Sequence, residues 1–582
     1  MRAVTINDQE IGSGARVASS RPVPANDDLA PADLTAAQEP DSEPEQAAPV
    51  PPAAAAPVRK MPAFAYFGAS TLLALAQGFG MNMIAGNLPQ FQGAYSATQT
   101  EATWLIAANL APNVSLSVAL IKVRQQFGIR TFAEWSIGVF VLVSILHLFV
   151  TDLQSAIAIR FIAGIAAAPM SGLAFLYMIE KVSPENKLTY GLTAALTNIA
   201  LMPSLTRVLF PALFDLGGVH ALYLFELGLA MMAFGAIYLL PLASPPRAKV
   251  IERLDVVSYL FVAVGCGALA VVLTTGRLYW WLEAPWIGKA LVVSFFCLAA
   301  AALIELNRKQ PFFDIRWLTS PEIVHFTVVL LLFRLLLTEQ TASATNFFLI
   351  LGLQADQLTG LYSVIAVSTV FGGLLCALVI KPGREPHIHL FCLALIAVGA
   401  FMDSRATNLT RPHDIYLSQG MIAVASAMFL PLTMGQGLAN ALKKGPNYIF
   451  SFIILFLATQ SLGAQMASAA FGTLITLREK FHANVLAQTI TLTDPVVANR
   501  VSQLSATYGH TLTDSALLKA EGTNLLSQQI TREANVLAYN DVFLLISVLS
   551  AGAALCLLAH VTFNAIKNRI RDRHAAEAPV AA

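Results

Sequence analysis

Residues 188–214 read LTYGLTAALTNIALMPSLTRVLFPALF, an apolar run that contains one charged side chain, Arg207. A helix rises ~1.5 Å per residue, so about 20 apolar residues cross the hydrocarbon core of a bilayer. The run therefore predicts a membrane-spanning helix. A charge in that core costs several kcal/mol unless it is paired or reaches the headgroups, so such residues are rare and mark functional sites. Arg207 is the first candidate functional residue.

The composition of the whole chain supports a membrane protein. Its 582 residues are 56% hydrophobic and only 12% charged, about half the charged fraction of a soluble protein. The net charge of +1 gives no basic field for nucleic acid, so no nucleic-acid partner is expected. The five cysteines lie in apolar runs, and no phosphate-binding loop, His-Glu-x-x-His or Gly-x-Ser-x-Gly motif occurs. We therefore predict no enzyme, metal site or cofactor.

Fourteen apolar segments follow a tail, residues 1–58, whose Ala, Pro and acidic residues predict disorder. Most segments are hydrophobic around the whole helix, as buried or lipid-facing helices are. They lie near 62–83, 101–121, 133–151, 155–179, 188–214, 219–242, 257–275, 286–305, 323–350, 358–380, 388–403, 415–438, 447–475 and 541–564.

The distribution of Lys and Arg between the loops orients these segments. One set of loops is rich in both residues, whereas the alternate short loops contain only Arg277, Arg405 and Arg411. Basic loops stay in the cytoplasm, so both termini are predicted to be cytoplasmic. Both termini on one side require an even number of spans, which agrees with the fourteen apolar segments. We expect a multi-pass protein of the cell inner membrane.

The outward segment 476–540 is longer and more polar than the other loops. Asp494 followed by Pro495 is the pattern of a helix start. Leucines and an isoleucine recur near helical spacing further on, at Leu517, Leu518, Leu525, Leu526 and Ile530. We expect a helical hairpin on the periplasmic side, with a mobile loop as the alternative.

Several short motifs occur in a characteristic order. AIAIRFIAGIAAAP (156–169) contains Arg160 and Gly164, and QPFFDIRWL (310–318), QGMIAVASAMFLPLT (419–433) and LAYNDVFLL (537–545) follow it. In this order, over residues 62–565, they resemble the fourteen-span drug:proton antiporters of the major facilitator superfamily, the EmrB/QacA-like branch.

The resemblance implies an all-α membrane protein with a major facilitator fold, in which two six-helix bundles and two inserted helices make 14 transmembrane helices. The expected parts are a disordered cytoplasmic tail (1–58), an N-terminal bundle (59–242), an inserted helix pair (243–310), the C-terminal bundle helices (311–475), a periplasmic helical loop (476–540), the last transmembrane helix (541–565) and a cytoplasmic tail (566–582).

Three family motifs are altered. Gly80 stands where the family carries an aspartate, and the first span contains no acidic residue. Gln125 occupies the acidic position of the motif in IKVRQQFGIR (121–130), and Thr206 and Arg207 replace a Gly-Pro pair in the fifth span. These departures leave the expected fold unchanged, but they make a non-transporting receptor or assembly partner an alternative function.

Three buried charges in the first half are candidates. Arg207 and Glu226 lie about seven residues inside the predicted outer ends of consecutive antiparallel spans, and their equal depth predicts a buried ion pair. Substrate binding, or snorkelling past Asp215, is the alternative for Arg207. The resemblance implies that Arg160 takes part in proton coupling, and snorkelling to the outer headgroups is its alternative.

The ninth predicted span contains Arg334 and Glu339 near its midplane. The resemblance places this helix beside the central cavity. A carboxyl group buried there can take up and release a proton, because burial disfavours its charged form. We therefore assign proton coupling to Glu339, Arg160 and Glu226. Substrate binding is assigned to Arg334, Arg207, Gln340, Asn109 and Asn113, with hydrogen bonds between helices as the alternative.

The predicted function is secondary export of a small organic molecule, a drug-like amphiphile or an organic acid, across the inner membrane. The resemblance implies proton antiport, with the proton gradient as the energy source and no other cofactor. Organic-anion uptake or facilitated transport is the alternative, favoured by three intramembrane arginines against two glutamates. The resemblance also implies a periplasmic adaptor of a tripartite efflux system, which would dock on segment 476–540.

Overall fold

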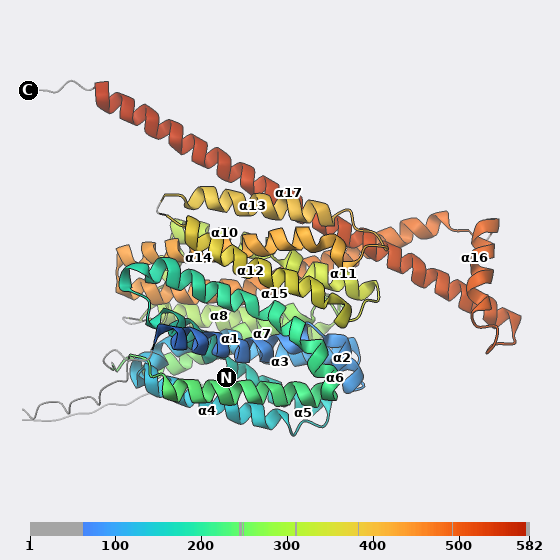
Figure 1. Cartoon of the computed structure of the whole chain (residues 1–582), viewed down its shortest axis with the longest axis horizontal. Helices are drawn as coiled ribbons and strands as arrows, with labels where there is room; N and C mark the ends of the chain where they lie inside the picture. The colour runs from blue at the N-terminus through green and yellow to red at the C-terminus, as the bar shows by residue number, and fades with distance from the viewer. Residues whose placement is uncertain are drawn as a thin grey trace, which may run out of the picture. The chain divides into compact units, whose positions relative to one another are not determined.

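The computed structural model describes residues 62–577 apart from 244–246, 248, 309–310, 382 and 492. Over these residues the regular structure is entirely helical (Figure 1), which confirms the predicted all-α class. The predicted tail 1–58 lies outside the described residues.

The first half of the chain forms six helices. They are α1 (Ala63–Ala85), α2 (Leu88–Ala94), α3 (Gln99–Phe127), α4 (Ile129–His147), α5 (Leu153–Glu180) and α6 (Leu192–Leu239). Helix α6 contains two predicted spans, and the chain reverses at Gly217 and Gly218. Gly218 has φ +62°, which glycine adopts without steric cost.

The second half begins with the inserted pair α7 (Arg253–Thr275) and α8 (Pro285–Leu306). The remaining helices are α9 (Ile315–Leu318), α10 (Pro321–Leu336), α11 (Ala344–Ile350), α12 (Thr359–Val379), α13 (Glu385–Asp403), α14 (Tyr416–Lys444), α15 (Pro446–Thr489), α16 (Pro495–Ala506) and α17 (Ser515–Glu577).

The predicted span 323–350 is broken rather than continuous. Helix α10 ends at Leu336, and a π-helical turn, Glu339–Ser343, leads into α11. A π-turn locally widens a helix and is frequent at functional sites. The break therefore contains two of the candidate residues, Glu339 and Gln340.

Local capping fixes where helices start. Thr98 Oγ1 accepts a hydrogen bond from the Glu101 amide at 3.3 Å, and the Glu101 carboxylate accepts one from the Thr98 amide at 2.9 Å. This reciprocal pair satisfies two amide groups that the first turn of α3 leaves without helical partners. Asp152 and Ser155 form the same arrangement at the start of α5.

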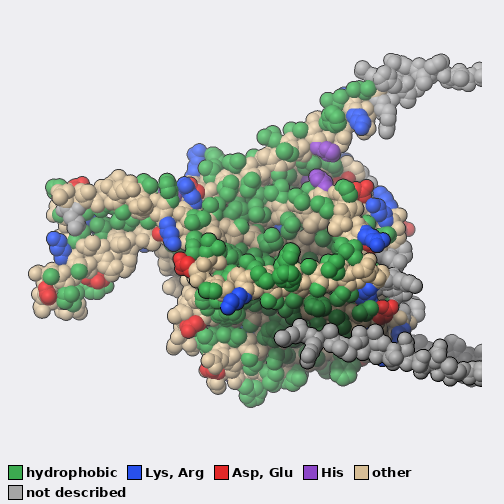
Figure 2. Space-filling view, turned by 180° about the vertical axis from the view of Figure 1, so that it is seen from behind, with side chains coloured by type: hydrophobic (Ala, Val, Ile, Leu, Met, Phe, Trp, Pro, Cys, Tyr) green, Lys and Arg blue, Asp and Glu red, His purple; other side chains and the backbone are tan. Residues whose placement is uncertain are grey.

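Eleven helices among the described residues are long and apolar enough to cross a membrane. In that number α6 counts once, and neither α1 nor the broken α10–α11 pair is included. Fourteen crossings therefore stays a prediction, while a multi-pass membrane protein is established. Figure 2 shows hydrophobic side chains over the middle of one face and most charged side chains toward its two ends.

Two large hydrophobic cores hold the helices together. One joins α1, α3, α4, α5 and α6, and the other joins α10 to α15 with α17. Helix α6 also packs against α12. A Cβ atom at Gly373 of α12 would collide with the side chain of Thr197, so the two halves approach closely there.

Buried ion pairs anchor the inserted helices at one end. Asp255 accepts from Lys122 Nζ of α3 at 2.7 Å and from Arg308 at 2.5 Å. Arg308 also contacts Glu305 at 3.1 Å and Glu252 at 2.9 Å. The side chains of Asp255 and Arg308 are only 2% and 5% exposed, so this network ties α7 and α8 to the first half.

Segment 476–540 is built from the end of α15, from α16 and from the start of α17. The Asp494 side chain accepts a hydrogen bond from the Val496 amide at 2.8 Å, which confirms the predicted helix start. Helix α16 packs against α17, and this part extends beyond the ends of the neighbouring helices (Figure 1). Its side of the membrane stays a prediction.

Candidate functional site

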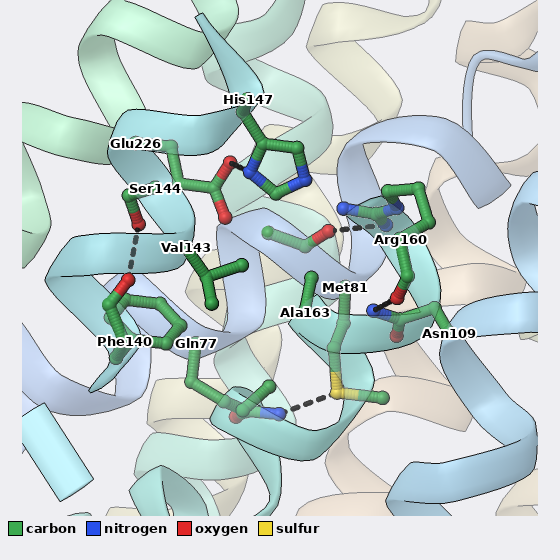
Figure 3. A pocket seen from close by; sticks show the side chains of 12 residues that line it. Gln77, Met81, Asn109, Phe140, Val143, Ser144, His147, Arg160, Ala163 and Glu226 are labelled. Carbon is green, nitrogen blue, oxygen red and sulfur yellow. Dashed lines mark hydrogen bonds and ion pairs between the residues drawn. The ribbon is translucent and has the colours of Figure 1, made fainter. Parts of the chain in front are cut away.

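A small pocket inside the first half contains three ionisable side chains. His147 of α4, Arg160 of α5 and Glu226 of α6 line it, and they are 1%, 1% and 3% exposed. Figure 3 shows the three side chains around the same space, with Asn109 beside Arg160. Arg160 therefore does not snorkel to the headgroups.

The carboxyl group of Glu226 lies against the backbone of α1. A Cβ atom at Gly80 would collide with Glu226 Oε1, so a larger residue at position 80 requires the carboxyl group to move. The antiporter family that this sequence resembles carries an aspartate at the position of Gly80. In this chain an acid from α6 instead reaches the space beside that position.

Arg160 and His147 complete the environment of Glu226. Arg160 Nη2 donates to the carbonyl oxygen of Gly80 at 2.7 Å, while its Nε and Nη1 have no hydrogen-bond partner within the described part of the chain. His147 Nδ1 lies 3.4 Å from Glu226 Oε2, and the imidazole ring stacks on Tyr223. The pocket thus combines an acid, a fixed cation and a titratable base.

The predicted ion pair between Arg207 and Glu226 is wrong. Arg207 Nη1 donates to Thr345 Oγ1 of α11 at 3.0 Å, and its guanidinium lies 5.1 Å from the ring centre of Tyr362 of α12. Arg207 packs beside Gly86 rather than Gly80, six residues or ~9 Å further along α1. It therefore lies between the two halves, outside the Glu226 pocket.

A second acid cluster lies in the other half. Gln419 Nε2 of α14 donates to Glu339 Oε1 at 2.9 Å and also lies 2.7 Å from Asp403 Oδ2 of α13. Ser418 Oγ donates to Asp403 as well. Glu339 and Gln419 are completely buried and Asp403 is 3% exposed.

Two carboxyl groups held by one amide repel each other when both are charged, and burial strengthens that repulsion. A single proton shared by Glu339 and Asp403 removes it. The cluster can therefore hold one proton and release it when its surroundings become hydrated.

The remaining predicted site residues are dispersed. Gln340 Nε2 donates to the Gln419 carbonyl at 2.9 Å, beside the Glu339 cluster. Asn109 and Asn113 of α3 donate to the carbonyl oxygens of Arg160 (3.3 Å) and Gly164 (3.2 Å) on α5. These bonds are the contacts between helices that the sequence left open as an alternative.

Arg334 and Glu339 contact different helices, since Glu339 is hydrogen-bonded to Gln419 of α14. A Cβ atom at Gly463 of α15 would lie 3.5 Å from Arg334 Cγ, so this arginine packs against α15. Its Nε atom is buried without a hydrogen-bond partner among the described residues. A polar ligand near α15 would satisfy that donor.

The sequence did not single out His147 or Asp403. His147 lies in the predicted segment 133–151 and Asp403 ends the segment 388–403, where a polar residue near the end of an apolar run indicates only a helix boundary. An available signal was Gln419, the first residue of the QGMIAVASAMFLPLT motif, because a buried amide needs polar partners.

Comparisons with known proteins give distant relatives, and no protein-family model matches the chain. The methylenomycin A resistance protein of Bacillus subtilis is 25% identical over 254 residues. That match covers 42% of this chain and 53% of the relative, so the chain spans about half of that protein's length. The fatty acid resistance protein FarB of Neisseria gonorrhoeae is 24% identical over 486 residues, which is 80% of this chain and 88% of FarB.

A solved structure shares the fold. The human organic anion transporter MFSD10 has a TM-score of 0.51 and 12% identity, with 84% of this chain and 100% of that chain covered. At this identity the similarity establishes the arrangement of helices alone.

Proposed function

Because the chain is a transporter of the major facilitator superfamily, distantly related to resistance proteins, we propose that it exports a small organic molecule across the inner membrane in exchange for protons. The substrate is a drug-like amphiphile or an organic acid. Two relatives are named for resistance to methylenomycin A and to fatty acids, and removing a toxic compound is how a transporter confers resistance.

The buried cluster of Glu339, Gln419 and Asp403 carries the proposal of proton exchange. Its two carboxyl groups share one amide donor, so they can bind one proton that neither would hold as readily alone. Transporters of this fold alternate between openings to either side of the membrane by rocking one bundle against the other. A proton taken up from outside and released inside would drive the outward step.

The Glu226 pocket provides a second proton site in the other half. Arg160 lies in the same pocket and supplies a positive charge when Glu226 is deprotonated. The nearby imidazole of His147 offers a route by which the proton can leave. This arrangement replaces the acid that the first span lacks.

The substrate would bind between the bundles. Arg207 of α6 joins Thr345 of α11 across that boundary, and Arg334 Nε is a buried donor with no partner among the residues that the structure describes. An arginine presents two parallel donors to a carboxylate, so both side chains suit an acidic substrate. The same arginines also favour organic-anion uptake as the second candidate function.

Transport by the purified chain in vesicles tests the proposal. A panel of long-chain carboxylates and cationic amphiphiles is offered with and without an imposed pH gradient. Export by proton antiport predicts that at least one compound crosses the membrane in the direction opposite to that of the protons. Movement in the direction of the protons supports uptake instead, and no transport of any compound under either condition supports a receptor or assembly partner.

A further inference from the structure

A larger pocket lies between α10, α13, α14 and α17. Its cavity volume is about 410 Å³, within the ~300–1,000 Å³ typical of small-molecule sites. None of the residues that line it belongs to either acid cluster. The transport scheme above therefore gives this pocket no role.

The two ends of the pocket differ in chemistry. Its walls are mostly apolar and include Leu332, Phe333, Leu336, Leu393, Phe429 and Leu557. The pocket also contains three histidines. His325 and His389 lie close to the first residues of α10 and α13, and His560 lies at the end of the last predicted span. All three helix ends are predicted to be cytoplasmic, so the histidines share one end of an otherwise apolar pocket.

The pocket opens on the surface that faces lipid. His325 and His560 are exposed, and Leu332 is 37% exposed. Figure 2 shows histidine side chains beside the base of the projecting C-terminal helix. A molecule in the membrane can therefore reach the pocket from the side, without entering the space between the two halves.

The histidines can donate hydrogen bonds to an acid. Asn564 Nδ2 lies 2.9 Å from His560 Nε2; when that nitrogen accepts, Nδ1 carries the hydrogen and becomes a donor. Lys567 follows His560 by seven residues on the same face of α17, ~10 Å further along the helix. Imidazole donors and a nearby ammonium group complement a carboxylate at the level of the headgroups.

We propose that this pocket binds a single-chain anionic amphiphile from the cytoplasmic leaflet. The hydrocarbon chain lies between Leu332, Leu393 and Leu557, and the acidic group lies at the histidines. As a site where substrate is collected before export, it rests on the proposed function; as a binding site, it stands independently. The volume accommodates one chain, which distinguishes this ligand from a two-chain phospholipid.

Photolabelling of the full chain in phosphatidylcholine nanodiscs tests the site. The probe is a long-chain carboxylate with a photoreactive group near the end of its chain. We expect cross-links within 325–336 and 553–560, and competition by the unlabelled carboxylate. The alcohol of equal chain length should compete about tenfold less well, because it lacks charge-assisted hydrogen bonds.

Substitutions at matched exposed leucines supply the control. Leu332→Trp narrows the mouth of the pocket and should reduce labelling about fivefold or more, the scale of a ~1 kcal/mol loss. Leu374→Trp, on α12 at a side chain that is 62% exposed, should leave labelling unchanged. His325→Ala combined with His560→Ala should remove the preference for the carboxylate over the alcohol.

Several results would overturn the site. They are even labelling of all lipid-facing helices, equal competition by the alcohol, equal competition by an added anionic two-chain phospholipid, or unchanged labelling of Leu332→Trp. Export is measured with the same preparations. Labelling without export removes the proposed function and keeps the site, whereas export without labelling removes the site alone.

Discussion

At position 80 the absence of a side chain creates the space that Glu226 fills. A Cβ atom there would collide with Glu226 Oε1, while the Gly80 carbonyl oxygen accepts from Arg160 at 2.7 Å. One residue therefore positions both an acid and a cation through its backbone. This pairing explains how the first span can lack an acid without the pocket losing one.

Substitution of Gly80 tests this arrangement. Gly80→Ala should destabilise the protein by about 1–3 kcal/mol, the usual cost of overpacking, and adding Glu226→Ala should recover most of that loss. Gly68→Ala on the same helix is the control, because no atom of the described residues lies within 4 Å of its Cβ position. Thermal unfolding in detergent is measured for the unchanged protein, Gly80→Ala, Glu226→Ala, the double variant and the Gly68→Ala control. Additive effects of Gly80→Ala and Glu226→Ala would contradict the contact.

Glu339 is the residue on which proton coupling depends. Glu339→Gln keeps the shape and hydrogen-bonding capacity of the side chain but cannot ionise. It should stop gradient-driven transport while substrate exchange at equilibrium continues, and Asp403→Asn should do the same because the two groups share one proton. Glu322→Gln, at a side chain that is 77% exposed, should transport normally. Gradient-driven transport by Glu339→Gln would exclude its role.

The sequence predicts single residues better than their partners. A lone Glu339 or Arg160 in an apolar run is visible because charge there is costly. The predicted partner of Arg207, Glu226, was wrong because the depth of a residue along a helix does not tell which face of the helix its side chain occupies. Arg207 and Glu226 are 19 positions apart on α6, on opposite sides of the reversal at Gly217 and Gly218.

Among the elements, the inserted pair α7–α8 is secured by the ion network around Asp255. Removing one member of a buried network leaves uncompensated charge and costs about 3–5 kcal/mol. Asp255→Ala should therefore lower the stability of the protein strongly, since Lys122 and Arg308 both lose their shared acceptor. Glu322→Gln, which breaks the exposed pair with Lys444, is the control and should change thermal unfolding little. Equal effects of the two substitutions would contradict an anchoring role.

The helical segment 476–540 should act as a docking surface. We expect the protein to co-purify with a periplasmic adaptor, and deletion of residues 485–530 should abolish that association while membrane insertion continues. The deletion covers α16, which packs against α17, so it removes the surface and leaves the last apolar segment in place. Association of the shortened protein with the adaptor would remove this role for the segment.

The presence of the helices could be predicted from the sequence, but the places where a helix is interrupted could not. The Asp494-Pro495 pattern located the start of α16 correctly. The π-helical turn at Glu339–Ser343 was missed because hydrophobicity remains high on both sides of it. Close contacts between helices, such as that of Gly164 with the Asn109 carbonyl, likewise become visible only in three dimensions.

At the scale of the whole molecule, the Glu226 pocket lies in the first half, the Glu339 cluster lies in the second half, and Arg207 lies at the boundary between them. Helices α6 and α12 also meet across this boundary, where a Cβ atom at Gly373 would collide with Thr197. The order of motifs predicted this two-part fold because each motif belongs to a particular span. The substrate is not specified by that order, since the site depends on side chains from several helices.

Simultaneous recording of substrate and proton movement in vesicles tests proton-coupled export most directly. A pH-sensitive dye inside the vesicles follows protons, while a radiolabelled substrate identified by the panel follows transport. We predict that substrate and protons move in opposite directions. A substrate gradient without a pH gradient should drive protons in the direction opposite to the substrate, and Glu339→Gln should abolish both coupled movements. Substrate transport at the same rate with and without the pH gradient, with no accompanying change of internal pH, would contradict the account.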